Sequence, residues 1–379
     1  MIASLCMNFR QGFFPIIAVA IFMGTVTPSP AEALRTENVV LITADGIRVQ
    51  EFFGGVDSMM LKNKERAGLK SVGRTKKRLW RKTASERRKL MFPFFWGELA
   101  QRGIVFGNAG RGSKVVVKNG NYISFPGYAE MLTGSPIPSI TTNLPVRIPR
   151  KTVLEYTRES LGLSKRQVAA FGSWGAFNNI CESKAGTVFI NAGYEKLPED
   201  LVTDQNRVLN DVQFDMMTPW DSARHDSVTI GLALDHMKTQ RPTLTFIALD
   251  ETDDWAHERR YDRVIHGARL FDEALRDLFA FIDSDPHYSG RTTVIVATDH
   301  GRGVTPEDWT SHDKKIPGSE DIWVAVFGPD TPRVGEVGST ATLTQGQIAA
   351  TILKFLGLDH KKYDPKAAPP IDEAFNNPN

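Results

Sequence analysis

The sequence predicts an α/β protein, built as a three-layer α/β/α sandwich around a largely parallel sheet. Short apolar segments alternate along the chain with segments whose apolar residues have helical spacing, which is typical of this class. Residues 38–43 (NVVLIT) are almost continuously apolar, as expected for a strand that is covered on both faces. We find no internal repeat and no linker that separates two domains, so loops and helices inserted into one domain account for the remaining length.

The other elements follow from local patterns. Thr83 and Glu86 form a T-x-x-E capping box, which predicts a helix from about residue 84 to 102. Thr344 is the expected N-cap of the last helix. Residues 104–118 predict a hairpin with Gly107 and Gly110 in its turn. Further strands are expected at residues 168–171, 187–190, 244–249, 293–298 and 322–327, and further helices at 128–132, 153–161, 227–238, 261–282 and 345–356.

The two ends of the chain predict different things. Arg10, an apolar run over residues 12–26 and the small-residue exit Ala31-Glu32-Ala33 together predict a signal peptide over residues 1–33. The alternative is a retained N-terminal anchor, although the run is short for a membrane span. A catalytic domain over 34–360 with no later transmembrane segment would then be periplasmic or secreted. Residues 361–379 are rich in Pro, Ala and Asn and predict a loose tail.

Cysteine content and charge limit the possible functions. Cys181 would be the single cysteine after signal cleavage, which excludes a disulfide framework and a cysteine-rich zinc site. Residues 62–89, within an expected basic insertion at about 51–92, hold 13 Lys and Arg against two Glu. Such a segment can receive anionic substrates, lipid head groups or nucleic acid, or it can simply be a solvated insertion. Trp80 is its single aromatic residue, which favours the solvated insertion and argues against specific nucleic-acid binding.

Acidic and histidine side chains follow several predicted strands. Ligands of open α/β sheets bind beyond the carboxyl ends of the strands, so this placement is informative. An Asp after a strand is individually more often a helix cap, but three carboxylates and three His at successive strand ends favour a zinc-like divalent site. Asp253 and His257 are one helical turn apart and can grip one ion together. The candidate metal ligands are Asp45, Asp253, His257, Asp299, His300 and His312.

Ser124 is the candidate nucleophile. It precedes Phe125-Pro126-Gly127 at the expected start of a helix, where backbone N–H groups favour anions. Ser124 could equally be a plain helix cap. Beside a divalent ion, however, its hydroxyl would ionise far more readily and become a strong nucleophile.

The order of these motifs resembles that of the alkaline phosphatase superfamily, in particular its nucleotide pyrophosphatase/phosphodiesterase-like and sulfatase-like hydrolases. The order is Asp-Gly, then Ser-Phe-Pro, then Asp-x-x-x-His, then Asp-His-Gly, then His, and it spans residues 39–328. The resemblance implies an alkaline phosphatase-like fold, two divalent ions and hydrolysis of a small anionic phosphate ester through a phospho-enzyme on Ser124. Zinc is favoured by the three His, while manganese and calcium also accept such oxygen-rich sites.

The resemblance also implies individual roles. One ion would be held by Asp45, Ser124, Asp299 and His300, and the other by Asp253, His257 and His312. Asn143 stands where phosphodiesterase-like members place an Asn that touches a phosphoryl oxygen. Asp250 and Asp254 could orient His257 or a water. The histidines expected to bind no metal are His225, His236, His266, His287 and His360.

Two departures from the family pattern bear on the substrate. Pro126 is followed by Gly127 and Tyr128, with no Arg, so conversion of Ser124 to formylglycine is not expected. No Arg follows Ser124 closely enough to clamp a phosphate dianion, which favours diesters or a broad specificity.

The alternative functions are a phosphotransferase or mutase of the same superfamily and a non-catalytic periplasmic binding relative. A non-catalytic relative would be expected to have lost the metal-ligating residue type at one or more motif positions, and every motif position here keeps it.

Overall fold

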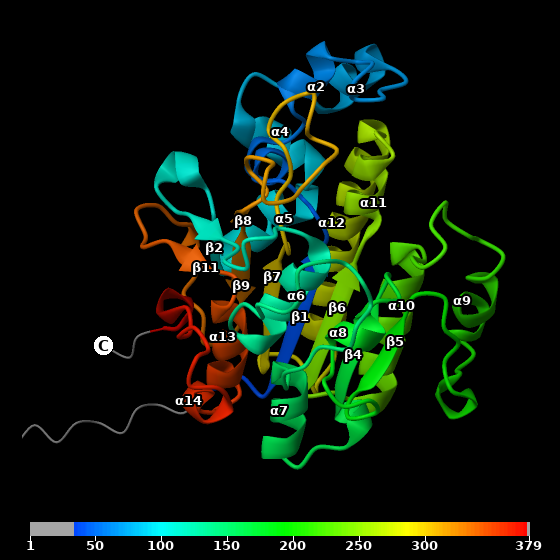
Figure 1. Cartoon of the computed structure of the whole chain (residues 1–379), viewed down its shortest axis with the longest axis vertical. Helices are drawn as coiled ribbons and strands as arrows, with labels where there is room; N and C mark the ends of the chain where they lie inside the picture. Colours follow the sequence, from blue (N-terminus) through cyan, green and yellow to red (C-terminus); the bar gives the residue numbers. More distant parts are fainter. Residues whose placement is uncertain (1–33, 377–379) are drawn as a thin grey trace, which may run out of the picture. The chain divides into compact units, whose positions relative to one another are not determined.

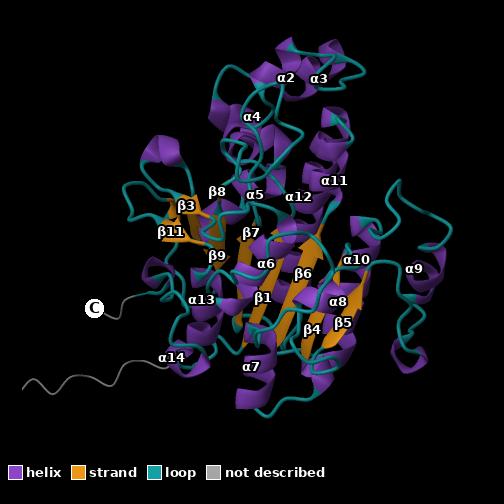
Figure 2. Cartoon of the chain, in the orientation of Figure 1, coloured by secondary structure: helices purple, strands orange, loops and turns teal. Residues whose placement is uncertain are grey.

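The centre of the protein is an eight-stranded sheet in the order β10-β2-β9-β7-β1-β6-β4-β5, seen in a computed structural model that describes residues 34–376 (Figures 1 and 2). The five strands from β7 to β5 are parallel, and β9 runs antiparallel to both of its neighbours. The strands are β1 (Asn38–Ala44), β2 (Ile104–Phe106), β4 (Val168–Gly172), β5 (Phe189–Ala192), β6 (Leu244–Leu249), β7 (Thr292–Ala297), β9 (Val324–Phe327) and β10 (Gly335–Glu336). A smaller sheet has the order β11-β3-β8, from Leu343–Thr344, Val115–Val116 and Asp321–Ile322.

Helices cover both faces of the large sheet, which confirms the predicted α/β/α sandwich (Figure 2). Strand β1 shows why both faces are apolar: Val40 and Ile42 lie in one hydrophobic core, and Val39 and Leu41 lie in the other. The helices are α1 (Val49–Gly54), α2 (Ser58–Lys62), α3 (Val72–Leu79), α4 (Ala84–Met91), α5 (Pro93–Gly97), α6 (Ser124–Thr133), α7 (Val153–Ser160), α8 (Phe177–Ile180), α9 (Arg207–Val212), α10 (Asp226–Gln240), α11 (Glu251–His257), α12 (Tyr261–Ser284), α13 (Gln347–Phe355) and α14 (His360–Tyr363). Five short 3₁₀ segments are Leu99–Arg102, Ala109–Arg111, Lys165–Gln167, Glu199–Leu201 and Asp372–Ala374.

The helix predicted over residues 84–102 is broken at Pro93. The Thr83–Glu86 capping box is present and opens α4, but α4 ends at Met91. Pro93 has no N–H to donate and becomes the first residue of α5 instead. The Asp272 carboxylate accepts hydrogen bonds from the N–H groups of Phe94 and Phe95 at 2.8 Å each, so it caps the new helix from α12.

The hairpin predicted over residues 104–118 is wrong. Strand β2 pairs with β9 in the large sheet, whereas β3 pairs with β8 and β11 in the small one. Gly107 serves close packing instead of a hairpin turn, because a Cβ there would lie 2.6 Å from the carbonyl oxygen of Ile322. The pairing is therefore set by long-range contacts that local turn residues do not encode.

The C-terminal segment also differs from its prediction. Thr344 lies in β11 and does not cap α13, whose N-cap is Gly346. The predicted loose tail is packed onto the domain as far as residue 376. The Phe375 ring stacks on Phe355 with centroids 4.2 Å apart, and the buried Ile371 donates its N–H to the Thr351 hydroxyl at 2.9 Å. Apolar side chains among the Pro and Ala residues thus anchor this segment.

The predicted signal peptide, residues 1–33, lies outside the described residues. Residues 34–376 contain no helix that is both long and apolar enough to cross a membrane.

The buried His236 gives the fold a predicted pH dependence. Its ring stacks on Phe189 at 4.7 Å and donates from Nε2 to the Arg166 carbonyl at 3.0 Å. Burial lowers its pKa from 6.5 to about 4. Between pH 6.5 and 4 the unfolded chain binds a proton there that the native protein does not, so the free energy of unfolding falls as pH falls. We expect a loss of about 2 kcal/mol from this residue between pH 6.5 and 4.5.

Urea unfolding of the His236→Phe variant checks this expectation. The phenyl ring keeps the stack but cannot be protonated, so the stability of the variant should fall less between pH 6.5 and 4.5 than that of the parent protein. The control is His266→Phe, at an exposed position on α12, which should keep the parent pH dependence. Equal pH dependence in both variants would contradict the assignment.

Candidate metal centre

Seven predicted site residues meet at the carboxyl ends of β1, β6 and β7. Asp45 follows β1 directly, and its N–H donates to the Leu249 carbonyl at the end of β6 at 2.8 Å. Helix α11 begins after β6 and carries Asp253 and His257. Asp299 and His300 follow β7, His312 lies in the loop between β7 and β8, and Ser124 begins α6. The seven residues are Asp45, Ser124, Asp253, His257, Asp299, His300 and His312.

Asp253 is at the centre of this cluster. Its carboxylate lies 3.0 Å from His257 Nε2, 3.6 Å from His312 Nε2 and 3.8 Å from His300 Nε2. Two sets of three residues have their donor atoms close together: within each set, all donor atoms lie within 4.8 Å of one another. Asp253 belongs to both sets. One set is Asp253, His257 and His312, and the other is Asp45, Asp253 and His300.

Two of the three histidines are held so that Nε2 faces the cluster. His300 Nδ1 lies 2.8 Å from the Gly301 carbonyl and His312 Nδ1 lies 3.0 Å from the Tyr122 carbonyl, so each Nδ1–H donates outward and each Nε2 is directed at the cluster. Their rings stack with centroids 3.8 Å apart. Histidine ligands of metals are usually oriented by such a bond from the second ring nitrogen.

The electrostatics of the cluster call for a cation. Burial, and after it the nearby Asp45 carboxylate, raise the pKa of Asp299 to about 8. Burial alone would lower the pKa of His300, but the Asp299 and Asp45 carboxylates raise it to about 9. Both oxygens of Asp45 and Oδ2 of Asp299 are buried without a hydrogen bond. Buried, unsatisfied carboxylates beside aligned imidazoles fit a divalent ion of the zinc type.

Ser124 is the first residue of α6, beside the cluster. Its Oγ lies 3.2 Å from His300 Nε2, and its side chain is buried. Helix α6 can approach this closely because residue 127 is glycine: a Cβ there would be 2.9 Å from the Asp299 carbonyl. Tyr122 has a positive φ of 54°, an uncommon conformation that turns its carbonyl toward His312.

The amides of the first turn of α6 are less available to an anion than the sequence suggested. The Phe125 N–H donates to Asn143 Oδ1 at 2.9 Å, Pro126 has none, and the Gly127 N–H is bonded to the Ile123 carbonyl. Asn143 is exposed and uses its Oδ1 in this bond, so its Nδ2 is the group it can offer to a ligand.

Arg302 is a site residue that the sequence reasoning missed. Its guanidinium is buried and contacts the Asp253 carboxylate, and it donates from Nε to the Trp309 carbonyl at 3.1 Å. Burial lowers its pKa to about 9. Because Arg302 is held by Asp253 and by main-chain carbonyls, it orients a candidate metal ligand and does not supply the missing phosphate clamp. The only signal in the sequence is its position directly after Asp-His-Gly.

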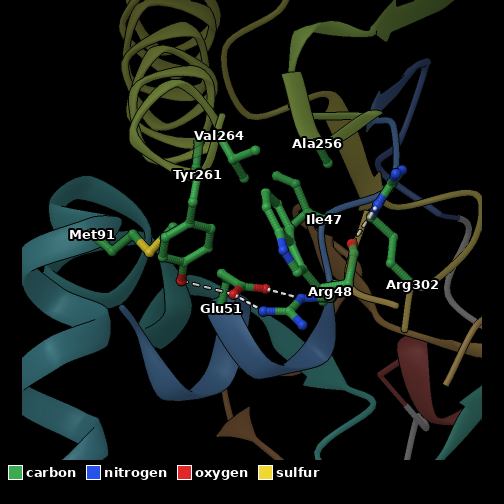
Figure 3. A pocket seen from close by; sticks show the side chains of 11 residues that line it. Ile47, Arg48, Glu51, Met91, Ala256, Tyr261, Val264 and Arg302 are labelled. Atoms are coloured by element: carbon green, nitrogen blue, oxygen red, sulfur yellow. Dashed lines mark hydrogen bonds and ion pairs between the residues drawn. The ribbon is translucent and has the colours of Figure 1, made fainter. Parts of the chain in front are cut away.

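A second buried pair supports the loop that carries Arg302 (Figure 3). Arg48 donates from Nη1 to the Gly303 carbonyl at 2.9 Å and from Nε to Glu51 at 2.7 Å. The Tyr261 hydroxyl of α12 donates to the same Glu51 carboxylate at 2.8 Å. The network therefore links α1, α12 and the loop after β7 behind the cluster.

The other acidic and histidine residues lie outside both donor sets. Asp250 and Asp254 are next to each other in space, and burial raises the pKa of Asp254 to about 7. His225, for which no acidic partner was expected, lies 3.1 Å from the Glu251 carboxylate. Within the described part of the chain, none of the five histidines predicted to be incidental belongs to a donor set.

Comparisons with known proteins agree with this picture. The family model described as Metalloenzyme superfamily matches residues 189–360. No curated protein matches the sequence. Many solved structures share the fold. Wild-type alkaline phosphatase PafA has a TM-score of 0.57 and 11% identity, covering 91% of this chain and 100% of that chain. BT4656 in complex with its substrate D-glucosamine-2-N,6-O-disulfate has a TM-score of 0.55 and 10% identity (90% of this chain, 80% of that chain), and phosphonate monoester hydrolase SpPMH from Silicibacter pomeroyi has a TM-score of 0.52 and 12% identity (91% of this chain, 78% of that chain). The predicted alkaline phosphatase-like fold is confirmed.

Proposed function

Since the chain has an alkaline phosphatase-like fold and matches the Metalloenzyme superfamily over residues 189–360, we propose that it is a metal-dependent hydrolase of phosphate esters with Ser124 as its nucleophile. The observation that carries the proposal is the convergence of Ser124 on the two donor sets that share Asp253. The similar structures act on phosphate, phosphonate and sulfate esters according to their names, so the sulfate ester is the competing substrate.

The residues fit two divalent ions, with zinc favoured and manganese or calcium as the other candidates. Asp45, Asp299, His300 and Ser124 would hold one ion, and Asp253, His257 and His312 the other. Support comes from the two donor sets, from the His300 and His312 Nε2 atoms that face the cluster and from the unsatisfied carboxylate oxygens. Ions bound there would act as Lewis acids and favour the ionised Ser124 hydroxyl.

The chain's own groups have separable roles in the proposed reaction. Ser124 Oγ attacks phosphorus and the ester oxygen leaves, and water then releases phosphate from Ser124. The Tyr122 and Gly301 carbonyls keep the His312 and His300 rings in orientation, while Arg302 does the same for Asp253. Asn143 Nδ2 would donate to a phosphoryl oxygen while its Oδ1 stays on the Phe125 N–H. A lower kcat of Asn143→Ala at unchanged metal content would support that role, and an unchanged kcat would remove it.

Turnover of three p-nitrophenyl esters tests the proposal. The purified protein, with zinc and then with a chelator, is assayed on p-nitrophenyl phosphate, bis-p-nitrophenyl phosphate and p-nitrophenyl sulfate. We expect chelator-sensitive hydrolysis of at least one phosphate ester at a higher kcat/KM than that of the sulfate. Faster hydrolysis of the sulfate would reassign the substrate. No hydrolysis of any ester by protein with metal bound would overturn the hydrolase proposal.

A further inference from the structure

The basic segment at residues 62–89 carries far more positive charge than the fold neutralises. Within the described residues, the salt bridges of this segment are those of Arg66 with Glu307 and of Arg88 with Glu336. Its other Lys and Arg are without a salt bridge, and nearly all of them are exposed. Like charges gathered on one surface repel each other and weaken the folded state, so the segment carries a cost that an anionic partner would remove.

Part of this charge lines a groove. The groove lies between α3 and α12 and has a volume of about 240 Å³. We call it the α3–α12 groove. Its cationic lining comes from both sides, with Lys70, Arg74 and Arg78 on one side and Arg263, next to His266, on the other. Asp262 is the acidic residue of the lining, and it is already paired with Arg260 through two hydrogen bonds of 2.9 Å. A concave surface with cations on both walls focuses positive potential.

The α3–α12 groove is attached to the rim of the metal centre. The Ala67 carbonyl accepts the Tyr261 N–H at 3.0 Å, just past the turn that follows His257. Gly68 is pressed against the same turn, because a Cβ there would lie 1.8 Å from the Arg259 carbonyl. Lys70 follows two residues later, so its Cα is within about 7 Å of that of Gly68.

A second contact fixes the same segment on the other side of the rim. Trp309, which is three residues before His312, donates from Nε1 to the Arg66 carbonyl at 3.0 Å. The segment thus contacts the chain next to both His257 and His312. In Figure 1, α2 and α3 lie above the end of the sheet where α11 begins.

The side chains of the groove indicate the chemistry of its ligand. Three of the four cationic groups are guanidinium groups, which bind phosphate and sulfate oxygens in pairs. The exposed large hydrophobic side chains of the described chain all lie outside residues 62–89, so this surface has nothing to insert into a lipid layer. Arg87 covers one face of the Trp80 ring at 4.6 Å from its centroid, and the Trp80 side chain packs partly buried against the hydrophobic core, which argues against base stacking.

We propose that the α3–α12 groove is a binding subsite for a soluble polyanion that carries phosphate or sulfate groups and extends from the metal centre. That the bound molecule is the substrate rests on the proposed function. Binding in the groove does not depend on it, since none of the four cationic residues of the groove belongs to the metal centre. The substrate class is then an ester with several anionic groups, one at Ser124 and others in the groove.

Binding to metal-free Ser124→Ala protein tests the subsite apart from catalysis. Sucrose octasulfate is titrated calorimetrically into this protein at several salt concentrations. We expect binding whose log Kd rises linearly with log salt between about 50 and about 200 mM. The double variant Arg74→Glu/Arg78→Glu, and separately Arg263→Glu on the opposite wall, should weaken binding at least about tenfold, because repulsion replaces charge-assisted hydrogen bonds.

The matched control is Lys361→Glu/Lys362→Glu on α14, which makes the same charge change at the other end of the molecule (Figure 1). It should bind sucrose octasulfate with the parent Kd, and circular dichroism and Tm verify that each variant is folded. If the control variant bound sucrose octasulfate as weakly as the groove variants, net charge alone would explain the loss of binding, and the proposed subsite would be wrong. Absence of binding would overturn it too, as would binding to 3:1 phosphatidylcholine:phosphatidylglycerol vesicles that sucrose octasulfate cannot displace. None of these outcomes depends on whether the protein hydrolyses esters.

Discussion

Replacing Ser124 with alanine is expected to lower kcat by at least about a thousandfold while the metal stays bound. Removal of a nucleophile that forms a covalent intermediate generally costs this much or more. The ions should remain because the ion proposed for Ser124 keeps Asp45, Asp299 and His300, and the residues of the other donor set do not include Ser124. The measurements are kcat on p-nitrophenyl phosphate or its diester and metal content by inductively coupled plasma mass spectrometry.

Two further variants make the Ser124 result specific. Ser124→Thr keeps a hydroxyl at the first position of α6 and should recover part of the activity. Ser85→Ala, on the exposed first turn of α4, should be fully active. Full activity of Ser124→Ala would remove Ser124 as the nucleophile and leave direct attack by water as the mechanism.

Replacing Asp253 with asparagine is expected to release one ion and to weaken the binding of the other. Asp253 is the residue common to both donor sets, and in its absence each set is reduced to two residues. We expect the ion proposed for Asp253, His257 and His312 to be lost, the ion proposed for Asp45, Asp299, His300 and Ser124 to remain with a raised Kd, and kcat to fall at least about a hundredfold. The Arg302 guanidinium would also lose its buried carboxylate partner, so the variant should be less stable to urea than the parent protein.

Asp45→Asn is the informative comparison for Asp253→Asn. Asp45 belongs to one donor set, so this variant should keep one ion, bound by Asp253, His257 and His312. Asp277→Asn, at an exposed position on α12, should keep both. If Asp253→Asn bound its remaining ion as tightly as the parent protein, the shared role of Asp253 would be wrong.

The grouping of the candidate metal ligands was predictable because these residues follow a topological rule. Asp45 and Asp299 come directly after apolar runs and Asp253 lies in the first turn of the helix after another, and parallel strands bring their carboxyl ends to one edge of the sheet. Each strand needs only local information, so residues far apart in sequence could be grouped before any contact was known. The fold class was predictable for the same reason, since β1, β6 and β7 are buried on both faces.

What escaped prediction depends on partners that are distant in sequence. The Arg302–Asp253 contact joins the loop after β7 to helix α11 across 49 positions and leaves no periodic signal. The separation of β2 from β3 follows from their pairing with β9 and β8 more than 200 residues away. Pro93 did carry a local signal for the break between α4 and α5, yet the apolar stripe around it suggested one continuous helix.

Gly46 sets a limit on how this protein can change over evolutionary time. Its φ is +60°, and a Cβ there would lie 2.5 Å from Asp253 Oδ1 and 3.2 Å from the Arg302 guanidinium. Any other residue would have to displace the carboxylate common to both donor sets. A lineage could therefore vary its substrate through the outer loops and the basic insertion, but position 46 offers it no neutral step, and a library of all twenty residues there should yield active protein with glycine alone.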